Sequence, residues 1–249
     1  MVLNRPEKNN ALSVGLLVDL YHALTEWSAD DTIRTLVITG SGGKAFCSGF
    51  DILSIPTNLT PQMEEFLKDH NPLDLVFSGI KKYPYPVIAM LNGHVFGAGF
   101  NLAVCCDIRV AADDIRMGMP PARLGLVYHP EGIKQFAEAL GMARTREIFL
   151  TAKTYGPHEI REMGLVHHMV PRMELADKTY GLAEVIAANA PLSLKGTKRI
   201  INMLASAVSF RQEDLKEAET LINAAFNSED LKEGQTAFVQ KRKPEFKGR

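Results

Sequence analysis

The sequence predicts an α/β fold built on a mostly parallel sheet. Short apolar runs at 35–39, 87–91 and 108–111 have the length and character of buried strands. Between residues 11 and 27, apolar side chains recur at helical spacing. Strands that alternate with helices along one chain favour parallel strands covered by helices, and this is the fold class that we expect.

The second half of the chain is dominated by helical spacing. Helices are expected at 131–140, 144–150, 158–163, 175–188, 192–204 and 212–226, and a brief strand at 167–170. Residues 52–74 are polar and contain three prolines, so we expect a loop or lid there with a short helix near 62–68. The tripeptide Asn189-Ala190-Pro191 divides the chain into an expected α/β core of residues 1–190 and a helical region of residues 191–249.

Composition restricts the classes of protein to consider. The 249 residues suffice for one large domain or two small ones. The formal net charge of -1 argues against a nucleic-acid binder that relies on an overall positive field. Cys47, Cys105 and Cys106 lie in apolar runs, so we expect buried thiols rather than disulfides or metal ligands. No secretory signal follows Met1, and no apolar run reaches the ~18 residues of a membrane span, so we expect a cytoplasmic protein with no membrane partner.

A small-residue turn, Gly97-Ala98-Gly99, separates two apolar stretches in the middle of the chain. The run at 86–91 before it has the character of a strand, and residues 102–106 after it have that of a buried helix. Small side chains leave the N–H groups at the helix start uncovered. Because such N–H groups and the helix dipole favour negative charge, we expect an anion to form beside this turn.

A second glycine segment has the same potential. This segment, residues 44–51, follows the strand expected at 35–39, and Gly49 allows its backbone to bend sharply. The N–H of Phe50 then faces that of Ala98. Two converging N–H donors suit a thioester oxygen that gains negative charge, and each such donor contributes about 3–4 kcal/mol to transition-state stabilisation.

The order of these motifs resembles the crotonase (enoyl-CoA hydratase/isomerase) family over nearly the whole chain. The matching segments are residues 3–12, 45–51, 92–101 with 106–109, and 233–234 with 237–244. The resemblance implies a ββα spiral core with a C-terminal helical trimerisation region, in a homotrimer or a dimer of trimers. It implies an acyl-CoA thioester as the partner, with coenzyme A as part of the substrate; we expect no tightly bound cofactor and no metal. Members usually carry another strand before Leu3, so we expect either a trimmed start or a reduced sheet edge.

The resemblance also assigns roles to individual residues. It places the oxyanion donors at the N–H groups of Phe50 and Ala98. It implies that the loop 45–53 meets the CoA adenine and pantetheine, and that the C-terminal helix contributes near the nucleotide. The helical tail is expected to pack either on a neighbouring subunit or on its own core. The expected substrate- and CoA-binding residues are Ala45, Cys47, Ser48, Gly49, Asp51, Ile52, Leu53, Gly97, Met119, Pro121, Phe238 and Lys241.

Two positions depart from the hydratases of this family. Those enzymes activate water with two glutamates, and the corresponding positions here are Asn101 and Pro121. Neither side chain accepts a proton in a useful pKa range, so hydration by the two-glutamate route is not expected. The missing glutamates favour loss of a carboxylate as carbon dioxide, a lyase-type reaction that needs no strong base and leaves an enolate between the oxyanion donors.

One short segment carries candidate proton-transfer groups in place of the glutamates. Tyr128, His129 and Glu131 lie within four residues, at the start of an expected helix. Family members that decarboxylate methylmalonyl-CoA carry a tyrosine at the place of Tyr128. The match to them is partial, because they carry a histidine where this chain has Phe50 and a threonine where it has Pro120.

We expect Tyr128 or His129 to hydrogen-bond the leaving carboxylate or to protonate the enolate. Two alternatives remain open: an acyl-CoA hydrolase or double-bond isomerase that uses His129 with Glu131, and a non-catalytic acyl-CoA binder. The three side chains also have structural interpretations, in which the tyrosine packs, the histidine ends a turn and the glutamate favours the helix start. Asp51 and Asp107 are expected to hold turns through backbone hydrogen bonds.

Overall fold

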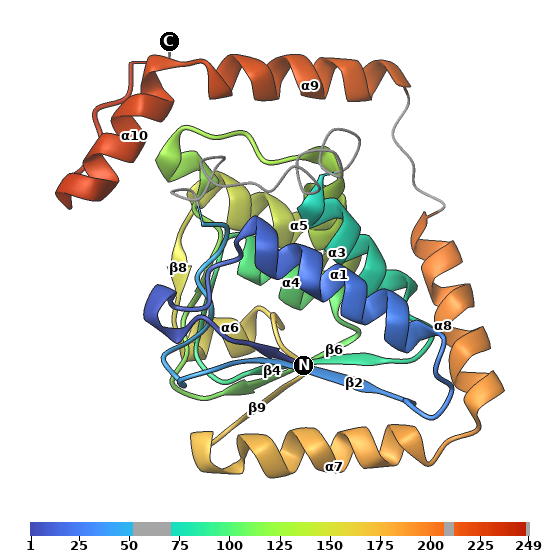
Figure 1. The fold of residues 1–249 in the computed structure, drawn as a ribbon. Coiled ribbons are helices and arrows are strands. Elements are labelled where there is room, and N and C mark those ends of the chain that lie inside the picture. The colour runs from blue at the N-terminus through green and yellow to red at the C-terminus, as the bar shows by residue number, and fades with distance from the viewer. Residues whose placement is uncertain (52–70, 207–211, 248–249) are drawn as a thin grey trace. The chain divides into compact units, whose positions relative to one another are not determined.

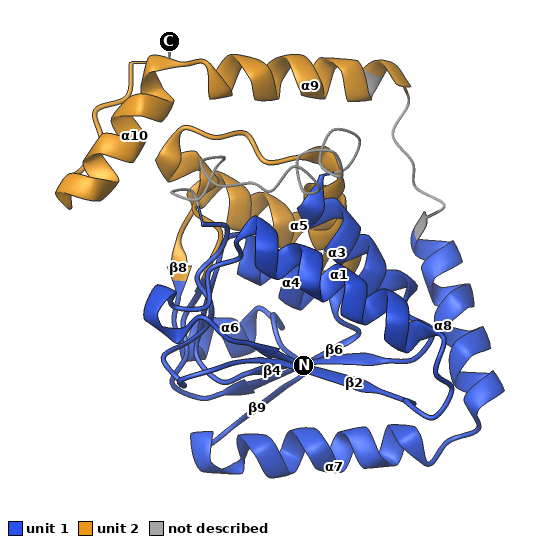
Figure 2. Ribbon diagram, viewed as in Figure 1, with its two compact units in different colours: residues 1–117, 155–205 blue, residues 118–154, 206–249 orange. Residues whose placement is uncertain are grey.

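The computed structural model describes residues 1–51, 71–206 and 212–247. The chain forms two compact units (Figure 2). Unit 1 comprises Met1–Met117 and Tyr155–Ala205, and unit 2 comprises Gly118–Thr154 and Ser206–Arg249. The division into a core of residues 1–190 and a helical region of residues 191–249 stays a prediction.

The main sheet of unit 1 has five parallel strands in the order β1-β2-β4-β6-β9 (Figure 1). They are β1 (Val2–Leu3), β2 (Leu36–Gly40), β4 (Val87–Leu91), β6 (Ile108–Ala112) and β9 (His168–Val170). The register pairs Leu36 with Val87 and Ile88 with Ile108. Every strand expected from the sequence is present, close to its expected bounds, and the predicted parallel α/β class is confirmed.

Helices cover both faces of this sheet (Figure 1). Helices α1 (Val14–Ser28), α3 (Pro72–Lys82) and α4 (Ala98–Cys105) lie together on one face, and α7 (Leu175–Ala187) lies on the other against β4 and β6. All residues of β4 are buried, as expected for a strand that is covered on both sides. Unit 1 also contains α6 (Pro157–Glu162) and α8 (Pro191–Ser206).

A second sheet of short strands has the order β3-β5-β7-β8. These strands are β3 (Ala45–Cys47), β5 (His94–Phe96), β7 (Met117–Gly118) and β8 (Thr154–Tyr155). They were not predicted, because two or three residues are too few to show an alternating pattern. Strands β3 and β5 are parallel, and a Cβ on Gly93 would lie 2.6 Å from the backbone N of Ala45. Glycine lets the two segments approach closely here, so the residues after β3 lie beside those after β5.

Capping residues set the helix starts. Ser13 caps α1, because its Oγ accepts a hydrogen bond from a backbone N–H of the first turn (3.3 Å). Asn71 caps α3 by accepting from the N–H of Leu73 (3.0 Å), and Pro72 occupies the first helical position. The expectation of a loop that extends to residue 74 is therefore wrong at its end, since Pro72 begins a helix. The short helix expected near 62–68 lies outside the described residues.

The described part of unit 2 is mainly helical. Its elements include η3 (Pro121–Leu124), α5 (Pro130–Thr151), α9 (Gln212–Phe226) and α10 (Glu229–Gln240). Within α5, Gly141 has φ 79° and ψ 157°, which interrupts the helix where the sequence predicted a gap between two helices. Helix α10 packs on η3, since a Cβ on Gly234 would lie 2.8 Å from the backbone of Leu124 and one on Gly125 would lie 2.9 Å from that of Asp230. The last helix of the tail thus packs on its own chain.

In the described ranges, no helix has both the length and the apolar character needed to cross a membrane.

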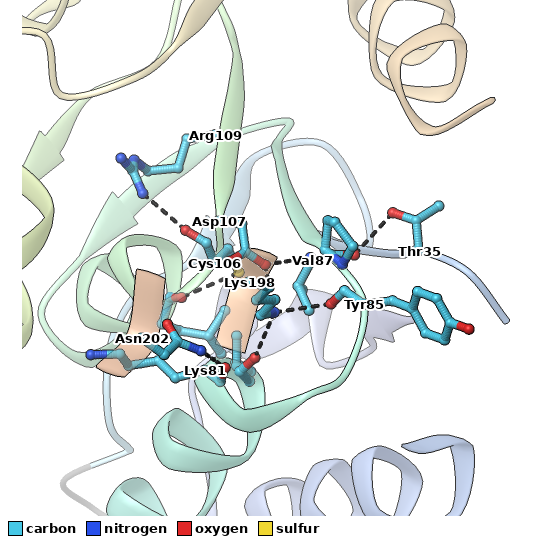
Figure 3. Close-up of polar contacts among 12 residues, drawn as sticks. Thr35, Lys81, Tyr85, Val87, Cys106, Asp107, Arg109, Lys198 and Asn202 are labelled. Atoms are coloured by element: carbon cyan, nitrogen blue, oxygen red, sulfur yellow. Dashed lines mark hydrogen bonds and ion pairs between the residues drawn. The ribbon is translucent and has the colours of Figure 1, made fainter. Parts of the chain in front are cut away.

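An ion pair between a buried lysine and a partly exposed aspartate joins α8 to the sheet of unit 1 (Figure 3). Lys198 is 7% exposed, and its Nζ lies 2.6 Å from Oδ2 of Asp107. Lys198 also donates to the carbonyl of Tyr85 (2.9 Å), while Asp107 accepts from the N–H of Val87 (2.7 Å). Asp107 was expected to hold a turn, and it instead accepts from the backbone at the start of β4, whereas the buried lysine was not predicted.

Candidate active site

The loop after β3 has an N–H group that does not bond to the neighbouring segment around Leu12. Leu12 and Phe50 form a parallel bridge. The N–H of Leu12 donates to the carbonyl of Gly49 (2.8 Å), and the N–H of Asp51 donates to the carbonyl of Leu12 (2.9 Å). In a trans peptide the C=O and N–H groups point in opposite directions, and no described peptide bond is cis. Because the Gly49 carbonyl points to Leu12, the Phe50 N–H points away from it.

A second N–H group lies at the start of α4. Gly97 is the N-cap, with φ 53° and ψ -125°, a conformation that glycine adopts without strain. Its carbonyl accepts from the N–H groups of Phe100 (2.9 Å) and Asn101 (3.1 Å). The N–H of Ala98, on the opposite side of the same peptide, therefore points out of the helix N-terminus, where the dipole favours negative charge.

The loop and the glycine turn lie in contact. A Cβ on Gly49 would lie 3.5 Å from the N of Ala98, and a Cβ on Gly97 would lie 3.6 Å from the Cα of Gly49. Within the part of the chain that the structure describes, neither the Phe50 N–H nor the Ala98 N–H donates a hydrogen bond. Unit 1 therefore brings together two backbone donors that its own secondary structure leaves unused.

Gly99 sets the spacing between α4 and β3. A Cβ on Gly99 would lie 2.6 Å from the Cβ and the O of Cys47, so only glycine permits this approach. Burial raises the pKa of the Cys47 thiol to about 12 and that of the Cys106 thiol likewise to about 12. Both thiols stay protonated and serve packing rather than catalysis. The prediction of three buried thiols is confirmed, and none of the three forms a disulfide bond.

Asn101 lies on α4 three residues after Ala98, which places both residues on one face of the helix. Its side chain is fully buried, and its Nδ2 lies 3.5 Å from the Sγ of Cys105. A carboxamide holds no charge and does not accept a proton near neutral pH. The buried polar side chain on this face of α4 is thus unsuited to the role of a general base.

In unit 2, Tyr128 is half-buried and packs on an aromatic pair of α5. Its ring centroid lies 5.4 Å from that of Phe149 with an interplanar angle of 47°. Phe149 in turn meets Phe136 edge-on, with a centroid distance of 5.1 Å. This stack fixes the orientation of the tyrosine ring through its apolar body, so the position of its hydroxyl is defined by packing.

His129 and Glu131 lie beside Tyr128 at the start of α5. His129 is the exposed N-cap residue, and its side chain makes no capping hydrogen bond. Glu131 lies in the first turn, with a carboxylate oxygen 3.9 Å from Nζ of Lys134. An exposed pair of this kind contributes little stability, although the carboxylate suits the helix N-terminus. These three candidates belong to unit 2, whereas the two backbone donors belong to unit 1.

The expected substrate-binding residues differ in exposure. The buried ones are Ala45, Cys47, Gly49, Met119 and Pro121. The half-buried ones are Asp51 and Gly97. The exposed ones are Ser48, Phe238 and Lys241, of which Phe238 is 75% exposed near the end of α10. Ile52 and Leu53 lie outside the described residues.

Two residues that hold the loop after β3 were not predicted. Arg5 lies 3.0 Å from the carboxylate of Asp51. Asn10 is fully buried and donates to the carbonyl of Ala45 (2.7 Å). The available signal is the dipeptide Asn9-Asn10, because asparagine tolerates the positive φ angles of 49° and 56° that occur there.

Two histidines, His94 and His167, have structural roles. His94 and His167 each accept a backbone N–H through Nδ1 at 3.1 Å. Burial, with a smaller contribution from Arg109, lowers the pKa of His167 to about 4. Within the described ranges, no three His, Cys, Asp or Glu side chains are grouped to hold a metal ion.

Comparison with known proteins agrees with this architecture. The chain matches the enoyl-CoA hydratase/isomerase family over residues 1–249. The short-chain-enoyl-CoA hydratase of Clostridium acetobutylicum is 31% identical over 255 residues, covering 100% of this chain and 94% of that protein. The methylmalonyl-CoA decarboxylase of Escherichia coli K12 is 31% identical over 246 residues, covering 98% of this chain and 92% of that protein.

The fold of this chain is also similar to the folds of solved structures. Methylmalonyl-CoA decarboxylase complexed with 2S-carboxypropyl-CoA superposes with a TM-score of 0.89 at 31% identity, covering 100% of this chain and 94% of that one. Family match, sequence relatives and fold all extend over the full chain. The chain therefore belongs to the enoyl-CoA hydratase/isomerase (crotonase) family.

Proposed function

We propose that this chain binds an acyl-CoA thioester and stabilises its enolate between the N–H groups of Phe50 and Ala98. The observation that carries the proposal is the contact between the loop and the glycine turn, with two backbone donors left unused beside it. Such donors bind the charged oxygen of an enolate more strongly than the neutral carbonyl of the thioester, and they lower the barrier for that reason. Coenzyme A enters as part of the substrate, and no tightly bound cofactor is required.

We further propose that the enolate arises by decarboxylation. The bond between the acyl Cα and a carboxylate breaks, carbon dioxide leaves, and the bonding electrons form the enolate, which then takes up a proton at Cα. The buried amide of Asn101 and the ring of Pro121 support this choice, because both occupy the positions of the hydratase glutamates. Overall similarity does not decide the reaction, since a hydratase and a decarboxylase are both 31% identical to this chain.

We propose that Tyr128 contacts the leaving carboxylate or protonates the enolate. His129 and Glu131 lie beside it at the start of α5. The packed ring of Tyr128 supports this role, because a fixed hydroxyl pays little entropy to form a hydrogen bond. The exposed imidazole of His129 supports the second candidate reaction, thioester hydrolysis or double-bond isomerisation, in which it would activate water or move a proton. The two reactions differ in their products.

The coenzyme A portion is proposed to lie along the loop of residues 45–53 and the end of α10. The exposed ring of Phe238 and the exposed amine of Lys241 support the second location, because an adenine can stack on the ring and a phosphate can pair with the amine. Met119 and Pro121 are proposed to line the acyl site.

We propose a homotrimer or a dimer of trimers, located in the cytoplasm. An exposed apolar face on α8 supports the assembly. Its members are Leu192, Ile200, Ile201, Met203 and Leu204, each more than half exposed. Apolar side chains in this number on one helix favour burial against another subunit. Light scattering coupled to size-exclusion chromatography tests this proposal, and a monomer at micromolar concentration would contradict it.

A product screen tests the reaction. The protein is incubated with a panel of carboxyacyl-CoA and enoyl-CoA thioesters, and released carbon dioxide, free CoA thiol and altered enoyl absorbance are measured in parallel. The proposal predicts carbon dioxide and the matching decarboxylated acyl-CoA. Free thiol or a shifted double bond without carbon dioxide would establish the second candidate reaction instead.

A matched pair of variants separates an enzyme from a non-catalytic binder. Tyr128→Phe removes the proposed hydroxyl, and Tyr180→Phe removes a hydroxyl from a half-exposed position on α7. The proposal predicts that only Tyr128→Phe slows turnover. CoA affinity without turnover of any thioester, unchanged in both variants, would contradict the assignment as an enzyme.

A further inference from the structure

The N-terminal segment before α1 is bonded to the loop that carries the Phe50 N–H. We infer that the ion pair between Arg5 and Asp51 is a clamp that positions this N–H group, an inference that rests on the proposed function. Arg5 and Asp51 are then positioning residues, because they act through the backbone of their neighbour rather than on the substrate.

The guanidinium joins the loop to residues 11–12, which form a β-bridge with it. One Arg5 nitrogen, Nη2, lies 3.0 Å from Oδ2 of Asp51, and the other, Nη1, donates to the carbonyl of Ala11 (2.8 Å). The Asp51 side chain is only 13% exposed, so the pair is poorly screened by water. Because Asp51 directly follows Phe50, the guanidinium fixes the chain one residue beyond the proposed donor.

The base of the clamp is itself rigid. Asn10 is fully buried, and its Oδ1 accepts from the backbone N–H of Arg5 (3.0 Å). Its Nδ2 donates to the carbonyls of Ser41 (2.9 Å) and Ala45 (2.7 Å). The residue that holds Asp51 is thus anchored to the ends of β2 and β3, the same framework that places the loop.

The clamp restrains a peptide that would otherwise turn. Gly49 has φ 108°, a conformation in which glycine has wide rotational freedom. The Gly49–Phe50 peptide is held on one side by the hydrogen bond from Leu12 and on the other through Asp51. If the charge on Asp51 is removed, the peptide can rotate and carry the Phe50 N–H away from that of Ala98.

Two single variants and their double variant test the clamp. Asp51→Asn and Arg5→Gln each remove one charge, and we expect kcat to fall about 10- to 100-fold with KM changed less than about threefold, as for a misplaced oxyanion donor. The double variant is expected to be no slower than either single variant, because both act through one contact. Asp51→Glu is expected to recover part of the lost kcat.

Arg172 and Asp114 supply the matched control. They form a second arginine–aspartate pair, with Nε and Nη2 each 2.7 Å from a carboxylate oxygen, at an exposed position. Asp114→Asn removes one charge of this pair and leaves the hydrogen bonds from Arg172 to the Gly43 and Asn92 carbonyls in place, so it is expected to leave kcat within about twofold of wild type. Thermal unfolding of all variants identifies any that fail to fold, and Asp51→Glu remains informative if Asp51→Asn does not fold.

Amide hydrogen exchange tests the clamp without turnover. The Leu12 and Asp51 amides donate the two hydrogen bonds of the bridge, so both are expected to exchange faster in Asp51→Asn than in wild type. Faster exchange together with reduced kcat supports the inference. Unchanged exchange, or faster exchange with wild-type kcat, overturns it. If wild type turns over no CoA thioester, the proposed function fails, whereas exchange still decides whether the pair holds the loop.

Discussion

The close packing of α4 on β3 predicts that Gly99→Ala impairs catalysis more than stability. A Cβ at this position would lie 2.6 Å from the Cβ and the O of Cys47, whereas ordinary contact begins at 3.4 Å. The helix and the strand must therefore separate by about 0.8 Å, the difference between these two distances. Overpacking of this kind costs about 1–3 kcal/mol. A displacement of about 1 Å at a catalytic group lowers the rate by ~10²-fold.

The assay compares kcat and the melting temperature of Gly99→Ala with those of wild type. We expect kcat to fall about 30- to 100-fold and the melting temperature to fall by about 2–10 °C. The helix carries the Ala98 N–H with it, so the proposed donor moves away from that of Phe50. Gly181→Ala on α7 is the control, since no atom of the described residues lies within 4 Å of the added Cβ. That variant is expected to keep wild-type kcat and to gain up to about 1 kcal/mol from helix propensity.

Two results would refute this reasoning. Wild-type stability in Gly99→Ala would show that α4 and β3 tolerate the added methyl group, contrary to the packing at Cys47. A lowered melting temperature with wild-type kcat would show that the spacing of the two segments does not control the reaction.

Three further perturbations test the site and the fold. Tyr128→Phe is expected to lower carbon dioxide release at least about tenfold, because the ring keeps its packing on Phe149 while the proposed hydroxyl is lost; equal rates would exclude a role for the hydroxyl. Lys198→Met removes the buried ammonium together with its hydrogen bonds to the Asp107 carboxylate and the Tyr85 carbonyl, and urea unfolding is expected to show a loss of about 1–2 kcal/mol; wild-type stability would contradict a structural role for this ion pair. The pKa of His167 is lowered to about 4 in the folded state, so the unfolded state binds more protons below pH 6.5. Stability should therefore fall as the pH decreases from 6.5 toward 4, and the urea midpoint of His167→Asn should fall less over this range.

The elements that were predictable carry their signal in consecutive residues. The run at 87–91 is apolar throughout because β4 is buried on both faces, so its composition alone identifies it. The gap left between the helices expected at 131–140 and 144–150 contains Gly141, whose positive φ interrupts α5. By contrast, β3 and β5 are three residues long, and their pairing depends on contact with each other rather than on any local pattern.

The candidate site also combines features that have a local sequence signal with features that depend on contacts between distant residues. Glycines in strand-to-helix turns indicate close backbone approach, and Gly49 lies in contact with Gly97 and the N of Ala98. The roles of Phe50 and Ala98 as oxyanion donors stay a prediction. The pair of Arg5 with Asp51 spans 46 residues, and that of Lys198 with Asp107 spans 91. Charged pairs so far apart leave no periodic signal, and only the folded chain reveals them.

The most direct test of the central claim is a crystal structure of the protein with a bound CoA thioester. We expect the thioester oxygen to lie about 2.7–3.1 Å from both the Phe50 N and the Ala98 N. An oxygen bound to other groups, or a side chain that fills the space between the two amides, would contradict the account.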